Sequence, residues 1–591
     1  MLAVDNTLEI AAREHKAGNL QYAKQLYEKV LEKFPGHYFS FFSLGVIEHQ
    51  RGNSDTAIKL IENAIEINPE IPQYYNTLGI IYETINKYDE AICAYQKAIL
   101  KEPDYAEAYL NIAIALKSQK KYIEAIENCR NSISITPGYA EAYNTLAFLL
   151  EKQKKYDEAI ENYKKAIKIK PDYVEAYNHL GDIYNELGDY QEAAKSFYTA
   201  MQYDPSYAEL YNNLGIAQKE LEQFDDAISN FKQAIKLEKN FAEAYYNLAN
   251  SLRDEGDCNE AVKNYKKAID INPDYAHAHW NLSLAQLLDG NYLEGWKGYK
   301  WRRNADLKVL TDYHKTGKSR WDGSSFKSKI LFMHYEQGLG DNIQFVRYLP
   351  MVKSRGGKVI FETLKPLIGL LNNFPGVDEI IEYNPDEKSS IQFDYYASLL
   401  DMPYIFETTV ETIPSDVPYI YADPVKSRYW SERISKDKFN VGIVWAGSPE
   451  HGNDRYRSCK LQSFSSLSMI EGVCLYGLQK GKAAEQMAEL TGQIPVINIS
   501  DDFEDFTDTA AAIDNLDLVI SVDTSVLHLA GAMGKKVWAL LPFSPEWRWM
   551  LNREDSPWYP TMKLFRQKKR NDWYGLFKQV CEELKMLVQN K

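Results

Sequence analysis

The sequence has few cysteines, no long apolar run and no excess of basic residues. Its six cysteines are scattered over 591 residues without a Cys-x-x-Cys pair, which excludes a disulfide framework and a cysteine-rich zinc site. No apolar run approaches the ~18 residues of a membrane-spanning helix. The net charge of −15 argues against sequence-independent nucleic-acid binding, which needs a basic surface. Since residues 1–6 show neither the basic start nor the apolar core of a secretory signal, we expect a cytoplasmic protein.

Tryptophan is missing from the start of the chain, and this absence divides the sequence. All eleven tryptophans lie at or after Trp280. Residues 1–300 carry 32 basic and 45 acidic side chains, a net charge of −13, whereas residues 301–591 carry 36 and 38, a net charge of −2. The composition therefore predicts two parts with a boundary near 280–325.

A period of 34 residues runs through the first part. Its mark is a residue that recurs at the end of each unit: Pro35, Pro69, Pro103, Pro137, Pro171, Pro205, Lys239 and Pro273. A strict period of this length is typical of a helix–turn–helix solenoid. In the unit 140–173, apolar and small side chains recur at offsets of three and four, which predicts two amphipathic helices, the second ended by Pro171. The pattern resembles the tetratricopeptide repeat, so we predict a superhelix of about nine repeats over residues 1–310, the last of them degenerate.

Asparagine recurs at one slot of these repeats. It is found there at Asn111, Asn213, Asn247 and Asn281. Because an amide both donates and accepts, such a series can hold a peptide backbone without reading its side chains. The series resembles the asparagine ladder of O-GlcNAc transferase, which implies a groove for an acceptor peptide. The alternative is that asparagine at this slot makes local hydrogen bonds.

The second part changes to alternating strands and helices. Apolar runs predict strands at 329–333, 358–361, 379–382, 393–396 and 418–421, and then at 440–445, 473–477, 496–498, 518–521 and 536–541. A charged segment at 422–438 predicts a linker helix, and an amphipathic helix is expected at 573–589. We predict two Rossmann-like α/β domains, 325–425 and 438–570, followed by the C-terminal helix within 571–591. Such folds bind ligands in the crevice at the carboxyl ends of the strands.

A glycine-rich segment, Gly338-Leu339-Gly340-Asp341, follows the first predicted strand. Glycines permit a tight turn and a close approach of the backbone to a ligand. Asp341 stands where a helix is expected to begin. A carboxylate at this place either acts as a general base or caps the helix, which aspartate does well.

A second polar segment, Ser521 to His528, joins a predicted strand to a predicted helix. Backbone N–H groups at the helix start, with the hydroxyls of Thr524 and Ser525, are suited to hold phosphate oxygens, and His528 adds a donor. The alternative is a capped helix with a satisfied histidine.

Other polar segments carry weaker signals. The run 453–458 contains two arginines, which suits a diphosphate but also suits a solvated loop. Gln479 and Lys480, after the strand at 473–477, are similar candidates. We interpret the acidic run 501–505 and the basic run 566–570 as solvated, with the alternative that Arg566 reaches the crevice. We predict no metal site.

Taken together, these motifs resemble the heptosyltransferase-like glycosyltransferases, a family with the two-domain GT-B fold, over about residues 325–570. In that family a Gly-Asp pair supplies the candidate base, matched here by Gly340-Asp341. A family Asp-Thr/Ser-Gly-x-x-His-Leu-Ala run binds the donor diphosphate; the segment from Asp523 matches it, with Ser525 in place of glycine. In the family, a basic residue after the first strand of the C-terminal domain binds phosphate. Here Arg455 and Arg457 are the nearest matches, and we prefer Arg457. We expect the donor at Gly338, Gly340, Arg457, Gln479, Lys480, Asp523, Thr524, Ser525 and His528.

The combination of repeats and transferase motifs resembles bacterial protein glycosyltransferases, including those that modify flagellin. The resemblance implies transfer of a sugar from a nucleotide-activated donor to Ser or Thr hydroxyls of a protein acceptor, flagellin or another surface protein, held by the repeats. It implies Asp341 as the base, and no cofactor beyond the nucleotide-sugar co-substrate. Two alternatives remain: a non-catalytic repeat scaffold for protein assembly, and a transferase that acts on lipopolysaccharide or another glycan.

Overall fold

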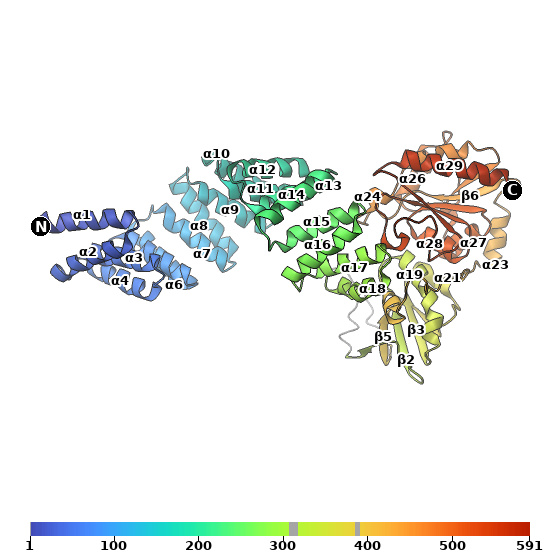
Figure 1. Ribbon diagram of the computed structural model, residues 1–591, viewed down its shortest axis with the longest axis horizontal. Coiled ribbons are helices and arrows are strands. Elements are labelled where there is room, and N and C mark those ends of the chain that lie inside the picture. Colours follow the sequence, from blue (N-terminus) through green and yellow to red (C-terminus); the bar gives the residue numbers. More distant parts are fainter. Residues whose placement is uncertain (1, 306–316, 385–390, 591) are drawn as a thin grey trace. The chain divides into compact units, whose positions relative to one another are not determined.

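The computed structural model describes residues 2–305, 317–384 and 391–590. Its backbone divides into two compact units, Met1–Lys239 and Asn240–Lys591. In the described residues the first unit is built from helices, and the second unit combines further repeat helices with two parallel sheets (Figure 1). An α-solenoid followed by an α/β region is therefore confirmed. The predicted end of the repeats at residue 310 lies outside the described residues.

Paired helices make up the first unit and the beginning of the second. Those of the first unit are α1 (Leu2–Lys16), α2 (Leu20–Lys33), α3 (Tyr38–Gln50), α4 (Ser54–Ile67), α5 (Pro72–Thr84), α6 (Tyr88–Lys101), α7 (Ala106–Ser118), α8 (Tyr122–Ile135), α9 (Ala140–Lys152), α10 (Tyr156–Ile169), α11 (Val174–Glu186), α12 (Tyr190–Tyr203), α13 (Ala208–Glu220) and α14 (Phe224–Leu237). The second unit begins with α15 (Ala242–Asp254), α16 (Cys258–Ile271), α17 (Ala276–Leu288) and α18 (Tyr292–Tyr299). From α2 to α16 the second helix of each pair ends two residues before the recurring proline position. Since α14 ends there although Lys239 replaces the proline, proline is not the only stop signal.

Glycines on the first helix of a pair pack against an aromatic ring of the second helix. A Cβ atom added to Gly181 would lie 2.5 Å from the ring of Phe197, and one added to Gly215 would lie 2.7 Å from the ring of Phe231. Both rings are fully buried. Close-packed interiors leave no room for an added methyl group at such a contact. Small residues at these positions therefore let the paired helices approach closely.

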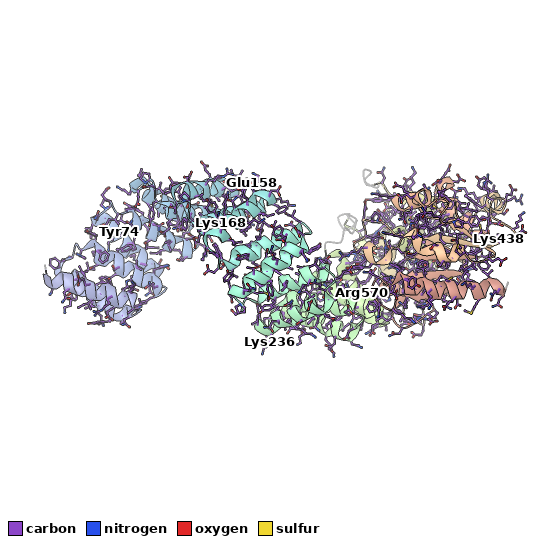
Figure 2. The ribbon with its side chains drawn as sticks, turned by 90° about the horizontal axis from the view of Figure 1, so that it is seen from above. Tyr74, Glu158, Lys168, Lys236, Lys438 and Arg570 are labelled. Carbon is purple, nitrogen blue, oxygen red and sulfur yellow. The ribbon has the colours of Figure 1, made fainter. Side chains whose placement is uncertain are left out.

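Charged side chains cover the exposed faces of these helices. Glu158 and Lys168 of α10 and Lys236 of α14 are all exposed (Figure 2). On the opposite face of α10, Ala159 and Tyr163 are fully buried. The predicted amphipathic pattern of the repeat helices is therefore confirmed for α10.

Two sheets of parallel strands form the rest of the second unit. The first contains β1 (Ser319–Arg320), β2 (Ile330–His334), β3 (Lys358–Thr363), β4 (Glu379–Glu382) and β5 (Tyr395–Ser398), in the order β1-β5-β2-β3-β4. The second contains β6 (Phe439–Val444), β7 (Val473–Gly477), β8 (Val496–Asn498), β9 (Leu518–Val522), β10 (Val537–Leu541) and β11 (Met562–Arg566), in the order β11-β10-β9-β6-β7-β8. Every residue of the central strands β6, β9 and β10 is buried, as expected of parallel strands covered on both faces.

Ten short helices lie between these strands in the described residues, and a longer one, α29, follows the last strand. They are α19 (Leu339–Phe345), α20 (Leu349–Lys353), α21 (Lys365–Leu371), α22 (Met402–Ile405), α23 (Pro424–Ser431), α24 (Asp454–Arg457), α25 (Ser465–Ser468), α26 (Glu485–Glu489), α27 (Phe506–Asp514), α28 (Ser525–Ala532) and α29 (Trp573–Gln589). The predicted linker helix corresponds to α23 and the predicted final helix to α29. None of the helices in the described residues combines the length and the hydropathy that crossing a membrane requires.

One strand prediction was wrong, and the strands β1 and β11 were not predicted. Residues 418–421 form no strand; the N–H groups of Tyr419 and Ile420 both point at the carbonyl of Ala532, and Pro418 has no N–H to give to a ladder. Conversely, β11 was not predicted. Its five residues include Lys563 and Arg566, so the apolar run is too short to stand out, but parallel pairing with β10 makes it a strand.

The two sheets order their strands in a similar way. In the first sheet the chain runs from β2 outward through β3 and β4 and returns to β5 on the other side of β2. In the second sheet it runs from β6 through β7 and β8 and returns to β9 on the other side of β6. The loops after β6 and β9 therefore leave in opposite directions, and open α/β sheets bind ligands at such a switch point.

The last repeat helix packs directly against the α/β region. The indole of Trp296 in α18 donates to the carbonyl of Thr408 (3.0 Å), and that of Trp558 donates to the hydroxyl of Tyr292 (3.2 Å). The rings of Trp296 and Trp547 lie 5.1 Å apart. Trp296, Trp547 and Trp558 thus help to join the last repeat to the α/β region.

Candidate functional site

Two helix N-termini meet at the carboxyl ends of the strands. Helix α19 follows β2 and helix α28 follows β9. A Cβ atom added to Gly340 would lie 2.9 Å from Cδ2 of His528 and 3.4 Å from Cα of Ser525. Glycine leaves room for this close approach of the two helices. The predicted Gly-Asp motif and the predicted donor-binding run are therefore neighbours.

Asp341 is the third residue of α19 and not its N-cap. Its Oδ2 accepts the N–H of Gly338 (2.9 Å), as the N3 residue of a capping box does. Its Oδ1 forms an ion pair with Nη2 of Arg548. The helix begins at Leu339, so the predicted glycine loop is shorter than the sequence suggests. The capping role of Asp341 is present, and it leaves the second carboxylate oxygen directed at Arg548.

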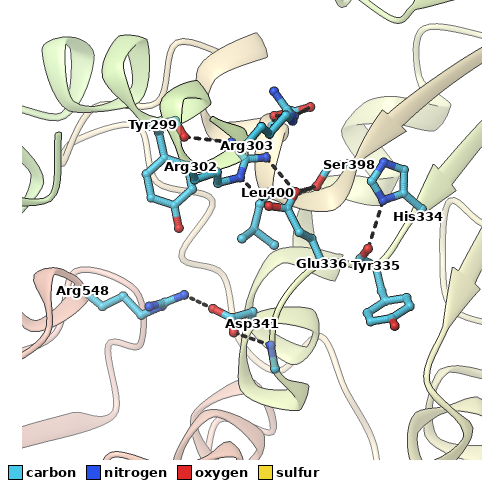
Figure 3. Close-up of polar contacts among 12 residues, drawn as sticks. Tyr299, Arg302, Arg303, His334, Tyr335, Glu336, Asp341, Ser398, Leu400 and Arg548 are labelled. Carbon is cyan, nitrogen blue, oxygen red and sulfur yellow. Dashed lines mark hydrogen bonds and ion pairs between the residues drawn. The ribbon is translucent and has the colours of Figure 1, made fainter. Parts of the chain in front are cut away.

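Arg548 is the residue of this cluster that the sequence analysis missed. It lies in the 3-10 turn η8 (Trp547–Trp549), in the loop after β10. Besides Asp341, its guanidinium bonds to Oε1 of Glu546 (Nη1, 2.5 Å) and to Oε1 of Gln344. Figure 3 shows Arg548 and Asp341 directed at one another. Burial lowers the pKa of Arg548, but Glu546 and Asp341 override it and raise that pKa, so the guanidinium stays charged. The sequence signal that could have identified Arg548 is its position between two tryptophans, Trp547 and Trp549.

Asp523 and Thr524 form the polar turn between β9 and α28. Oδ2 of Asp523 accepts the indole N–H of Trp549 (2.9 Å). Thr524 is the N-cap of α28, its hydroxyl lies 3.0 Å from that of Ser521, and Ser525 is the first residue of the helix. The start of α28 therefore offers the partial positive charge that a phosphate group prefers.

His528 lies one turn into α28 and is buried. Its Nδ1 lies 2.9 Å from the hydroxyl of Tyr559, and its Nε2 lies 3.8 Å from Oδ1 of Asp523. Burial, and then the nearby guanidinium groups of Arg548, Arg347 and Arg457, hold the pKa of His528 well below its usual value. The imidazole is therefore neutral at pH 7. The contact of Nδ1 with Tyr559 fits the alternative of a histidine whose hydrogen bonds are satisfied. The three arginines near the ring favour a negatively charged group in this region.

Arg457 belongs to the same electrostatic cluster. Its guanidinium lies against the backbone of Gly447, in the loop after β6. Burial, and next Arg457, lower the pKa of the neighbouring His451, whereas Asp523 and Asp341 act on it in the opposite direction. The predicted run 453–458 is thus within electrostatic reach of the two carboxylates, and His451 is a further polar residue there that sequence reasoning did not single out.

Gln479 and Lys480 hold loops together. The Gln479 side chain accepts the N–H groups of Trp445 and Ala446 (3.1 and 2.9 Å) and donates to the Ala446 carbonyl. Lys480 donates to the carbonyl of Ser500 (3.0 Å). The Gln479 bonds fix the start of the loop after β6, which leads to Arg457, whereas the Lys480 bond reaches the segment after β8. Donor contacts by the two residues themselves remain a prediction.

The asparagines of the repeats bond to the preceding repeat. Their amide nitrogens reach acceptors 31 or 35 residues back: Asn111 reaches Asn76, Asn213 reaches Asn178 and Asp182, and Asn281 reaches Tyr246 and Asn250. The bond lengths are 2.9–3.2 Å. Asn247, in the same slot, is half-buried. Links between repeats are thus one role of this slot, and a peptide that bound there would have to share or replace them.

A buried ion-pair network lies next to the site, and the sequence did not reveal it. Arg302, in the turn η1 (Lys300–Arg303) after α18, pairs with Glu336 (Nε–Oε1, 2.5 Å; Figure 3). It also pairs with Asp401 (2.9 Å), as does Arg303. Glu336 follows β2 and Asp401 follows β5, so the network fills the point where the strand order of the first sheet reverses. Burial raises the pKa of Asp401, but the two arginines hold it far below its usual range. An arginine from the repeat segment therefore fixes the start of the segment that leads to Asp341.

Arg566, at the end of β11, corrects part of the prediction that residues 566–570 are solvated. It is half-buried, and it donates to the carbonyls of Trp549 (2.5 Å) and Arg553 (3.1 Å). Burial, and then Arg553, lower the pKa of Arg566 to about 10. Gln567 is buried as well, whereas Lys568 and Lys569 are exposed as predicted. Arg566 holds the loop that carries Arg548.

The last residue of the acidic run 501–505, Asp505, is the N-cap of helix α27. Oδ1 of Asp505 accepts the N–H of Thr507 (2.7 Å) at the start of α27. Among the described residues no group of three or more His, Cys, Asp or Glu side chains is arranged to hold a metal ion.

Comparison with known families assigns the repeats. Models described as "TPR repeat" match residues 152–184 and 249–290, and models described as "Tetratricopeptide repeat" match residues 11–72, 72–105, 94–127, 128–161 and 172–239. The N-terminal half is a tetratricopeptide-repeat solenoid. The resemblance drawn from the 34-residue period is confirmed.

Individual proteins are similar to parts of this chain. Protein FlbA of Caulobacter vibrioides is 25% identical over 292 residues, which are 45% of this chain and 48% of FlbA. The chain thus spans about half the length of the curated relative it matches. Among solved structures, the tetratricopeptide-repeat protein YrrB, whose structure was described for an unusual peptide-binding site, is 23% identical over 31% of this chain and 95% of its own, with a TM-score of 0.28. PilF of Pseudomonas aeruginosa is 22% identical over 35% and 94%, with a TM-score of 0.32.

Proposed function

We propose that this chain transfers a sugar from a nucleotide-activated donor to Ser or Thr hydroxyls of a protein acceptor that its repeats bind. One observation supports the proposal most: the N-termini of α19 and α28 meet at Gly340 and His528, with Asp341 paired to Arg548 beside them. Two parallel sheets, a kind of fold that binds ligands at the carboxyl ends of its strands, fit the GT-B architecture of the heptosyltransferase-like family. Repeat solenoids present long concave surfaces, which suits capture of a protein acceptor.

In this reaction the donor diphosphate lies at the start of α28. The helix N-terminus, the hydroxyls of Thr524 and Ser525, and Arg457 stabilise the charge that develops on the departing phosphate. The acceptor hydroxyl attacks the anomeric carbon while a carboxylate of the cluster around Arg548 takes its proton. Neutral His528 adds a hydrogen-bond donor without bringing a charge of its own.

Intact-mass spectrometry of candidate acceptors tests this function. The acceptors, flagellin first, are isolated from cells that carry the wild-type chain, Asp341→Ala or the control Asp437→Ala, which changes an exposed aspartate of the same unit. We expect a sugar mass with the wild type and with the control, and its loss with Asp341→Ala. Trp fluorescence, which reports on residues 280 onward, checks that the variant is folded.

Identical acceptor masses in all three strains would contradict protein glycosylation. The second candidate, an assembly scaffold without catalysis, would then lead, and it is favoured by the family models, all of which describe repeats, and by the similarity to FlbA. It predicts that Asp341→Asn leaves the biological activity unchanged. A transferase for lipopolysaccharide or another glycan predicts instead sugar transfer to a purified glycan without any protein acceptor.

A further inference from the structure

The last residue of the run 566–570, Arg570, does not lie free in solvent. Its side chain is 21% exposed, and it reaches the turn between α15 and α16 (Figure 2). Its Nη2 donates to the carbonyl of Asp254 (2.5 Å) and to Oε1 of Glu255 (3.0 Å), and its Nε donates to the same carboxylate oxygen (3.1 Å). The prediction of a solvated run is therefore wrong for Arg570 as well as for Arg566.

The contact is built on the C-terminal end of α15. Asp254 is the last residue of that helix, and Glu255 is its C-cap. Because the last carbonyls of a helix lack partners within it and carry partial negative charge, a guanidinium is favoured there by the helix end as well as by the carboxylate. The repeat pattern does not require this carboxylate, since the residues 34 and 68 positions earlier are Leu221 and Leu187. The acidic partner of Arg570 is therefore particular to this repeat.

The same segment also holds the loop that carries Arg548. The guanidinium of Arg570 lies 5.2 Å from the ring centroid of Phe543, in the loop after β10. Arg566, four residues earlier, donates to the carbonyl of Trp549 in that loop (2.5 Å). The segment after β11 thus joins the end of α15 to the loop after β10.

The repeat helices that this segment fixes lead to the candidate site. Helix α17 is the first helix of the next pair, and it contacts the turn η8, in which Arg548 lies. A Cβ atom added to Gly290, after α17, would lie 2.8 Å from Cε of Met550, after η8. Asn247 on α15 and Asn281 on α17 occupy the slot for which the sequence predicts a peptide groove. A peptide held along these two helices would therefore lie beside the loop that carries Arg548.

We propose that Arg570 is a positioning residue for the protein acceptor. It locks the end of α15 to the loop after β10, so that an acceptor segment held by α15 and α17 meets the site around Arg548 at a fixed distance. The proposal rests on the proposed glycosyl transfer and adds no reacting group to it. Reactions between two bound partners are sensitive to such placement, because a displacement of about 1 Å can cost about 100-fold in rate.

Steady-state kinetics on the full chain test this assignment. The variants are Arg570→Met, Glu255→Ala and the double variant, with Lys569→Met as the matched control, since Lys569 is the exposed neighbour of Arg570. Sugar transfer is measured with the acceptor protein that mass spectrometry identifies for the wild type, and with the nucleotide sugar that the wild type uses. We expect Arg570→Met and Glu255→Ala each to lower kcat/KM for the acceptor by about tenfold or more, and Lys569→Met to leave it unchanged. The double variant should be no worse than Arg570→Met alone, because the two side chains act as one unit.

Further readouts separate positioning from damage to the donor site. In Arg570→Met, KM for the nucleotide sugar and the binding of UDP, GDP and ADP by calorimetry should change by less than about threefold, because no candidate donor-binding residue is altered. Amide hydrogen exchange of the full chain should become faster in residues 242–271, which contain α15 and α16, and stay unchanged in residues 1–239. Arg570→Lys keeps the charge but loses the planar fork, so it should recover part of kcat/KM.

The outcomes distinguish the positioning role from the transferase function. If Arg570→Met keeps the wild-type kcat/KM for the acceptor, or lowers it only together with nucleotide binding, the positioning role is overturned while the transferase function stands. Faster exchange without a change in acceptor kinetics also overturns it, because the contact is then structural only. If the wild type transfers no sugar to any acceptor, both proposals fail.

Discussion

Gly340 lies where helices α19 and α28 approach each other closely. Alanine is normally the better helix residue by about 1 kcal/mol, so Gly340→Ala in α19 should stabilise the chain if only helix propensity mattered. A Cβ atom at this place would instead lie 2.9 Å from the His528 ring. That ring is held by Tyr559 and stacks on Trp549, so it has little freedom to move. We expect Gly340→Ala to lower the free energy of unfolding of the second unit by about 1–3 kcal/mol and to weaken nucleoside diphosphate binding.

Urea unfolding followed by Trp emission measures this effect, because all eleven tryptophans lie at or after Trp280. Gly452→Ala is the matched control, since an added Cβ at Gly452 meets no atom within 4 Å. Equal midpoints for the two variants would show that α19 and α28 do not require the close approach at Gly340.

Arg302 is a second residue whose substitution should lower the free energy of unfolding. Arg302→Met leaves the buried carboxylates of Glu336 and Asp401 without their shared cation, and breaking one partner of a buried pair costs about 3–5 kcal/mol. We expect the urea midpoint of the Trp emission to fall accordingly. Lys297→Met removes an exposed pair with Glu294 on the neighbouring helix α18 and should hardly move the midpoint. A similar small shift for both variants would contradict a structural role of the network.

At the scale of the element, the repeat helices end without depending on any one proline. Helix α14 ends at Leu237 although Lys239 stands at the proline position, and α10 ends at Ile169 two residues before Pro171. We therefore expect Pro171→Lys to leave the helix content unchanged and to lower stability by about 1 kcal/mol or less, the amount that the lost restriction of the unfolded chain accounts for. Circular dichroism during thermal unfolding measures both. An extended helix or a large loss of stability would show that Pro171 is required.

At the scale of the whole molecule, the two units should divide the function. We expect a chain of residues 240–591 to retain the Trp emission and the nucleoside diphosphate binding of the full protein, because the sheets, the cluster around Arg548 and the repeat helices that pack on them all lie in that unit. Transfer to the protein acceptor should fall at least tenfold, since most repeats are lost. Calorimetry and acceptor mass spectrometry on the two chains test this. Undiminished transfer by residues 240–591 would assign acceptor recognition to the α/β region.

The sequence by itself determined the elements that repeat or that are strongly apolar. The 34-residue period defined the helix pairs, and apolar runs located all but one of the observed strands of three or more residues, because local spacing reports directly on burial. It failed where a neighbour decides the structure: Met562–Arg566 is a strand because it pairs with β10, and residues 418–421 are not, because their N–H groups turn to Ala532.

The candidate site shows the same division. Gly340, Asp341 and the segment from Asp523 could be selected from motif and position, since each follows a predicted strand. Arg548 and Arg302 could not be selected, because their chemistry comes from partners 34 to more than 200 residues away in the sequence. The tertiary structure alone decided that Asp341 is already paired and that Glu546 shares its cation, since burial and charge act through space and leave no local pattern in the chain.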